Sequence, residues 1–337
     1  MTLSGASLSI CSTSRAHQNA EPWMSEATRY FIGIDLLSRY QRNRASEPFR
    51  RTQSYHVSAT LALYCRYAHE RIRAYLRIAS KESSMLIDEK ARETFAKLEL
   101  EFSPVALKYY YAPPKGVERF EGTGAFCELV HAASSGDGAF YIDKDNETCF
   151  GKVALGMVPD NGLAASGLIG PDIDMYATQA PNARLHDLLP TLTLGAHNVV
   201  VMAPIKACDF DPDILVVVAP TEKAEIILRA TSWVSGDPWE SKSTPVMSCG
   251  WMYAHPYVTG KVNYCITGMH HGLKRRNLYP AGMHLIAIPF AKLPETIYSL
   301  ENMNWTPLYF RQDTEEGREE LAAAQARWAE AGTRIGG

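Results

Sequence analysis

Two uninterrupted runs of β-branched and aliphatic residues constrain the fold more than any other feature of the chain. "NVVVMAP" occupies residues 198–204, and "DILVVVAP" occupies residues 213–220. Neither run alternates between apolar and polar side chains, which is typical of strands that are buried on both faces. We therefore expect residues 199–202 and 214–218 to form adjacent central strands of a buried sheet with flanking helices.

Weaker patterns around these runs predict strands and helices in alternation. Strands are expected at residues 104–114, 139–143, 261–267 and 284–290, which are rich in β-branched and aromatic residues. Helices are expected at residues 55–81 and 84–101, where apolar residues recur at helical spacing. Further helices are expected at residues 125–133, 149–157, 221–236, 293–303 and 314–331. The interleaving predicts an α/β fold, with mixed α+β as the alternative.

The length of the chain allows one large domain. Of its 337 residues, 46% are hydrophobic, which is enough apolar material for a sizeable core. We expect a flexible extension at residues 1–54, a single α/β domain with an N-terminal helical extension at residues 55–312, and a C-terminal helix and tail at residues 313–337.

Charge and hydropathy exclude several classes of partner. A net charge of −3 argues against nucleic acid, because phosphate binding needs a clustered basic surface. No apolar run approaches the roughly 20 residues that a membrane helix needs. The seven cysteines are odd in number, scattered and without a CxxC pair, which favours reduced thiols in the cytoplasm. A small-molecule substrate is the expected partner, and a homo-oligomer is left open.

The stretch "NYCITGMHHG" places a thiol and two histidines close together. If residues 261–267 form a strand, Asn263 and Cys265 share one of its faces. His270 and His271 then follow the strand in a glycine-bracketed loop, and α/β folds often keep their chemistry in such loops. The alternative is a polar hairpin tip without function.

A second candidate lies in "GTGAFCELVH". Cys127 falls in the first turn of an expected helix, where the helix dipole lowers the pKa of a thiol and makes it more reactive. His131 follows one helical turn later and could act as a base or as a second ligand. The alternatives are a buried cysteine that behaves as a small apolar residue and a surface histidine.

Several motifs occur in an order that resembles a known family. They are "SPVALKYYYAPP", "FCELVHAA", "CFGKVALGM", "VVVMAP", "PDILVVVAPTEKAEIILRA" and "SCGWMYAHPYVTGKVNYCITG". Over roughly residues 82–303, the chain resembles the uncharacterised domain of unknown function 169 family, for which the resemblance implies no settled activity. It does imply cysteines at Cys127, Cys149 and Cys249, and a cysteine-containing turn near Gly268 that ends in an arginine. Here that turn reads "TGMHHGLKRR", so its cysteine is replaced and two histidines are present.

These observations lead to one hypothesis with two alternatives. The chain is expected to be an enzyme for a small anionic substrate, with Cys127, His131, His270 and His271 as catalytic residues. Lys261, Asn263 and Lys274 are expected to hold the anion or a cofactor. Alternatively, Cys127, Cys149, Cys249 and Cys265 bind a transition metal or an iron–sulfur cluster in a redox protein. A ligand-binding sensor without chemistry is the third reading.

Overall fold

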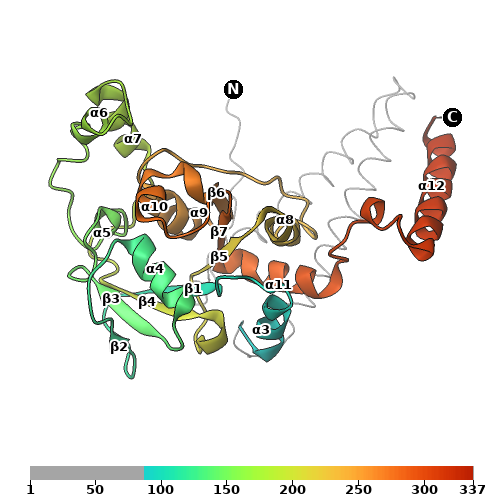
Figure 1. Ribbon diagram of the computed structural model, residues 1–337, viewed down its shortest axis with the longest axis horizontal. Coiled ribbons are helices and arrows are strands. Elements are labelled where there is room, and N and C mark those ends of the chain that lie inside the picture. Colours follow the sequence, from blue (N-terminus) through green and yellow to red (C-terminus); the bar gives the residue numbers. More distant parts are fainter. Residues whose placement is uncertain (1–86, 337) are drawn as a thin grey trace, which may run out of the picture. The chain divides into compact units, whose positions relative to one another are not determined.

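The computed structural model describes residues 87–336, and within this range the strands form one seven-stranded sheet (Figure 1). The strands are β1 (Val105–Tyr110), β2 (Glu118–Arg119), β3 (Phe140–Asp143), β4 (Val199–Pro204), β5 (Ile214–Ala219), β6 (Asn263–Ile266) and β7 (His284–Pro289). Their order across the sheet is β2-β3-β4-β1-β5-β7-β6. The pair β2–β3 is parallel, and the other neighbouring pairs are antiparallel.

The two apolar runs form β4 and β5, and every residue in both strands is buried, as the sequence predicts. The expectation that the two strands are adjacent is wrong. Strand β1 lies between them, with Val105 opposite Pro204 on one side and Val216 on the other. An apolar run reports that both faces of a strand are covered, but it carries no information about which strand lies beside it.

Ten helices accompany the sheet in the described range, so the fold is mixed α+β. They are α3 (Glu89–Ala96), α4 (Phe126–Ser135), α5 (Gly151–Ala154), α6 (Ile169–Asp172), α7 (Gln179–Leu188), α8 (Thr221–Ala230), α9 (His255–Thr259), α10 (His271–Arg276), α11 (Leu293–Asn302) and α12 (Glu315–Gly336). No helix in residues 87–336 is long and apolar enough to cross a membrane. The extension expected at residues 1–54 and the helix expected at 55–81 lie outside the described residues.

Each face of the sheet carries its own apolar core. In β5, Ile214, Val216 and Val218 belong to a cluster with α4 and the segment that precedes α9. The intervening residues of β5 belong to a second cluster, with side chains from α3, α8 and α11. Burial of each large aliphatic side chain contributes roughly 1.5–3 kcal/mol. Because both faces of the sheet are covered, its central strands are apolar throughout and do not alternate with polar residues.

A π-helical turn, η2 (Gly250–Ala254), leads directly into α9. The backbone N–H of His255 bonds to the carbonyl of Gly250, five residues earlier. The sequence suggests that Pro256 ends a helix or lies in a turn, but the chain stays helical through it. A proline ring clashes with the carbonyl four residues before it in a regular helix, and a wider turn relieves that clash. Cys249 and Tyr253 are presented by this segment.

Candidate functional site

The first turn of α4 is held by two carboxylates. The N–H of Ala125 donates to Oε2 of Glu128 at 2.7 Å, and the N–H of Phe126 donates to Oε1 of Glu147 at 3.0 Å. These bonds satisfy N–H groups that a helix start otherwise leaves unpaired. Cys127 therefore lies in the first turn of this helix, as expected.

Cys127 does not have the lowered pKa that its position predicts. Its side chain is 4% exposed, and burial raises the pKa of the thiol to about 11. The guanidinium of Arg276 opposes this effect but is the smaller influence. Loss of hydration outweighs the helix dipole, because the thiolate is far less stable away from water. Cys127 is thus a protonated thiol at neutral pH.

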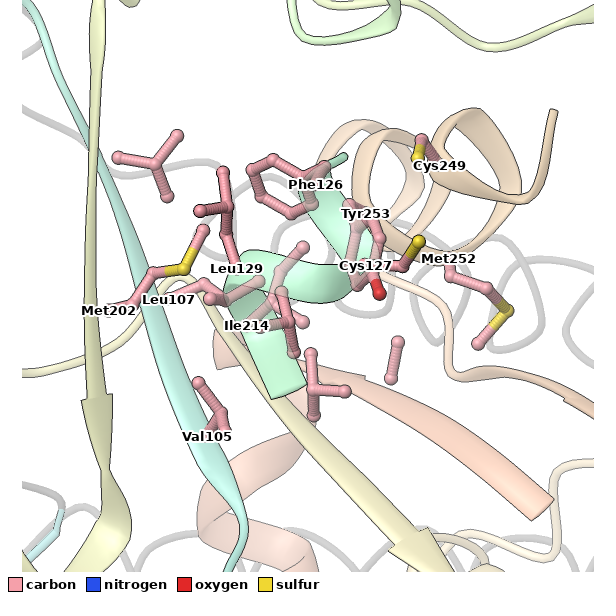
Figure 2. Packing of buried hydrophobic residues seen from close by; sticks show 14 of the residues in the cluster. Val105, Leu107, Phe126, Cys127, Leu129, Met202, Ile214, Cys249, Met252 and Tyr253 are labelled. Atoms are coloured by element: carbon pink, nitrogen blue, oxygen red, sulfur yellow. The ribbon is translucent and has the colours of Figure 1, made fainter. Parts of the chain in front are cut away.

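Three cysteines from distant segments converge near this helix start. Cys127 comes from α4, Cys149 from the loop before α5, and Cys249 from the start of η2. Burial raises the pKa of Cys249 far above its usual range, and the charges of Cys127 and Cys149 act on it as well. Figure 2 shows Cys127 and Phe126 packed with Cys249, Met252 and Tyr253 above the sheet. We call Cys127, Cys149 and Cys249 the thiol cluster.

One of the three thiols in the cluster is accessible to solvent. Cys149 is exposed, whereas Cys127 and Cys249 are buried. A reagent or substrate that reaches this cluster from solvent therefore meets the Cys149 thiol first.

Arg276, the last residue of α10, lies beside the thiol cluster. Its Nε is 3.1 Å from Oε2 of Glu128, and its Nη1 donates to the carbonyl of Gly272 at 3.2 Å. Burial works to lower the pKa of its guanidinium, but the pKa is raised because Cys127 and Cys149, when ionised, and Glu128 favour the charged form. The side chain is 15% exposed, so its charge is incompletely screened by water. Arg276 was not among the residues predicted from the sequence, although the family resemblance implies an arginine at the end of this turn.

Glu147 is the second residue that the sequence analysis missed. It is 1% exposed, and its two oxygens accept from the N–H groups of Phe126 and Lys152, each at 3.0 Å. Burial raises the pKa of this carboxyl, while the N–H groups of Lys152, Phe126 and Cys149 oppose the rise. Glu147 therefore joins the start of α4, the start of α5 and the Cys149 loop.

The family described as uncharacterised ArCR, DUF169, matches residues 96–299. The chain belongs to this family. Comparison with curated proteins and with solved structures finds no match. The matched range contains the whole thiol cluster together with Glu147 and Arg276.

Cys265 is the fourth cysteine of the metal site that the sequence of this DUF169 chain predicts. Cys265 lies on β6 and is 3% exposed, and burial alone raises its pKa to about 12. Within residues 87–336, no group of three or more Cys, His, Asp or Glu side chains is arranged to hold a metal ion. Cys265 belongs to the apolar core and Cys149 is exposed. The metal-binding role of the four cysteines stays a prediction.

His270 is buried rather than placed at a polar loop tip. It is 1% exposed, and its Nε2 lies 2.8 Å from the hydroxyl oxygen of Ser243. Its Nδ1 is buried without a hydrogen-bond partner, and burial lowers the pKa of the imidazole. His271 is the partly exposed first residue of α10, and its N–H donates to the carbonyl of Pro245 at 2.8 Å. The expected glycine-bracketed loop is therefore largely helical.

The three residues predicted to hold an anion or a cofactor lie elsewhere. Asn263 is fully buried, and its amide bonds the backbone of Lys242 through both oxygen and nitrogen, at 2.8 and 2.9 Å. Its nitrogen also donates to the carbonyl of Trp251 at 2.8 Å, so its contacts are structural. Lys261 is exposed and pairs with Glu240 at 3.5 Å, and Lys274 is exposed on α10. The cation that interacts electrostatically with Cys127 and Cys149 is Arg276.

His131 adjoins the thiol cluster through Tyr279. The two rings meet edge to face with centroids 5.0 Å apart. Burial raises the pKa of Tyr279, and Cys127, when ionised, adds to the rise. The Nδ1 atom of His131 is buried without a partner. His131 and Cys127 lie one turn apart on α4, and the role of His131 as a base stays a prediction.

A pocket with a volume of about 510 Å³ lies beside α5 and α7. None of the predicted site residues lines this pocket. Phe150 does line it, and Phe150 directly follows Cys149 in the chain. The pocket and the exposed thiol are therefore neighbours along the chain.

Proposed function

We propose that this DUF169 member is a cytoplasmic enzyme that acts on a small anionic substrate at the thiol cluster. Cys149 supplies the reacting thiol, and Arg276 holds the negatively charged group of the substrate. The observation that carries the proposal is the convergence of one exposed and two buried thiols with a partly buried guanidinium, from four separate segments.

Exposure distinguishes the thiols. The thiolate is the nucleophilic form, and burial holds Cys127 and Cys249 in the protonated form. Cys149 is exposed, so it is the thiol that a substrate can reach from solvent. The two buried thiols instead form part of the apolar core on this face of the sheet.

The guanidinium has donor capacity left for a ligand. Nε faces Glu128 and Nη1 donates to Gly272, while Nη2 makes no hydrogen bond to the described residues. The nearby carboxylate of Glu147 is already engaged by backbone N–H groups. A carboxylate or phosphate matches the geometry of a guanidinium, and this favours an anionic substrate.

The cytoplasmic location rests on the state of the thiols. The five cysteines in the described range are all free, which suits a reducing compartment. Nothing in the proposal depends on a metal ion.

Protection from alkylation tests the proposal. The rate at which iodoacetamide labels Cys149 is measured by peptide mass spectrometry, with inorganic phosphate or acetate against chloride at equal ionic strength. Because a bound anion covers the thiol, we expect phosphate or acetate to slow labelling severalfold.

The variants assign the effect to one side chain. Arg276→Gln should abolish protection, and Arg276→Lys should retain part of it because the charge remains. Arg275→Gln is the matched control, since Arg275 is the exposed neighbour on the same helix. Equal labelling rates with and without the anions in the wild-type protein would overturn the proposal.

A further inference from the structure

Backbone hydrogen bonds hold together the two chain segments that border the pocket beside α5 and α7. The N–H of Leu192 donates to the carbonyl of Ala154, and the N–H of Gly195 donates to the carbonyl of Gly156, both at 2.8 Å. Gly156 has a φ of +68°, and a Cβ there would lie 2.6 Å from the carbonyl oxygen of Thr193. The two segments therefore approach each other so closely that only glycine fits at position 156.

Most of the pocket wall is apolar. Phe150, Leu189 and Leu194 line it together with other aliphatic side chains. The ring of Phe150 meets the ring of His186 edge to face, with centroids 5.6 Å apart. A volume of about 510 Å³ falls within the range of sites for small organic molecules. The wall thus suits a ligand with an apolar body of about that size.

The charged side chains that line the pocket are all acidic. Asp160 and Asp187 line it, and no lysine or arginine is among its lining residues. His186 adds no compensating charge at neutral pH, because burial lowers the pKa of its imidazole more than the two aspartates raise it. Two carboxylates beside an apolar wall with an aromatic ring attract a positively charged organic group.

We infer that this pocket binds a small organic cation, an amine or ammonium group attached to an apolar body. Asp160 and Asp187 meet the charge, and Phe150 and the leucines cover the apolar part. The inference does not rest on the function proposed for the thiol cluster, because no cysteine and no residue of α10 lines the pocket. Failure of either proposal leaves the other standing.

Three probes that share one phenyl ring separate charge from shape. Phenethylamine is cationic, phenethyl alcohol is neutral and 3-phenylpropionate is anionic at neutral pH. Their affinities for the full-length protein are measured by ligand-observed NMR titration. We expect phenethylamine to bind most tightly and 3-phenylpropionate most weakly.

Neutralising the pocket should remove the preference. In the double variant Asp160→Asn with Asp187→Asn, phenethylamine should bind roughly fivefold more weakly, which corresponds to the loss of two exposed ion pairs. Asparagine keeps the oxygen with which Asp160 accepts the N–H of Gly162 at 3.0 Å, so the local turn is preserved.

Asp172→Asn is the matched control, because Asp172 is exposed on α6 in the same region and does not line the pocket. It should leave all three affinities unchanged. Equal or tighter binding of 3-phenylpropionate, or an unchanged phenethylamine affinity in the double variant, would overturn the inference.

Discussion

At the scale of single residues, Glu147 decides how the thiol cluster is built. A buried carboxylate normally costs free energy, but here backbone N–H groups at the starts of two helices surround it. Helix starts favour negative charge, so the same contacts that hold the carboxylate also fix both helices. Through these contacts, the Glu147 side chain fixes the positions of Cys127 and Cys149.

Replacing Glu147 with glutamine should destabilise the fold. Both carboxylate oxygens accept N–H groups, and a glutamine offers one oxygen and an NH₂ group that cannot accept. We expect a loss of about 2–3 kcal/mol in the free energy of unfolding, measured by urea denaturation. Glu121→Gln is the control, because Glu121 is exposed, and its effect should stay within about 0.5 kcal/mol. Equal stability of the two variants would contradict this account of Glu147.

Adding a methyl group at Gly151 tests how closely α4 and α5 pack at the same site. A Cβ at this position would lie 2.9 Å from Cβ of Phe126 and 3.0 Å from Oε1 of Glu147. Gly151→Ala should therefore push apart α4 and α5 and cost about 1–3 kcal/mol. Gly138→Ala, where no atom lies within 4 Å, should have little effect in the same thermal unfolding measurement. A wild-type melting temperature for Gly151→Ala would show that the two helices are not packed as described.

At the scale of elements, β4 and β5 behave as the apolar pattern predicts, while their arrangement does not follow from it. The runs themselves encode burial on both faces, and Val216 is 2% exposed. The insertion of β1 between the two strands depends on pairing with a segment almost a hundred residues earlier, which leaves no trace in either run. Strand β2 has only two residues and is too short to show any period.

A charge in the centre of β5 should be far more damaging than one on an edge strand. We expect Val216→Asp to cost at least about 3 kcal/mol, because the carboxylate would be buried without a partner. Ile266→Asp on β6 is the comparison, since Ile266 is 36% exposed, and its cost should be much smaller. Urea unfolding of both variants measures the difference, and similar losses would contradict the burial of β5.

At the scale of the whole molecule, buried thiols link stability to alkaline pH. Burial raises the pKa of Cys127 and Cys208 to about 11 and that of Cys265 to about 12. In the unfolded chain these thiols ionise near 9, so between these values the unfolded state binds fewer protons than the folded state. The stabilisation is complete below pH 9 and is lost as the pH rises toward 11 and 12.

Removing one of these thiols should flatten the alkaline slope. For Cys265→Ala, the fall in unfolding free energy between pH 9 and 11 should be smaller than in the wild type by roughly 2–3 kcal/mol. Because the pH dependence of the two proteins is compared, the pH-independent loss of stability caused by removing the side chain cancels. Urea midpoints at pH 8, 9, 10 and 11 provide the measurement, and parallel curves would show that Cys265 is not held protonated by burial.

The sequence predicts the parts of the site that depend on local pattern and fails where tertiary placement decides. Cys127 at a helix start follows from the glycines before it, and the family resemblance brings Cys149 and Cys249 into consideration. The raised pKa of Cys127 depends on burial by η2, more than a hundred residues away. Glu147 is invisible to a motif search, because its partners are backbone N–H groups that any sequence carries.

The central claim is that the charge of Arg276 acts at the exposed thiol of Cys149. Iodoacetate and iodoacetamide have similar size but differ in charge, so the ratio of their labelling rates at Cys149 reports the local potential. We predict that this ratio falls roughly two- to fivefold in Arg276→Gln and stays at the wild-type value in Arg275→Gln. A ratio that is the same in the wild type and in Arg276→Gln would contradict the claim.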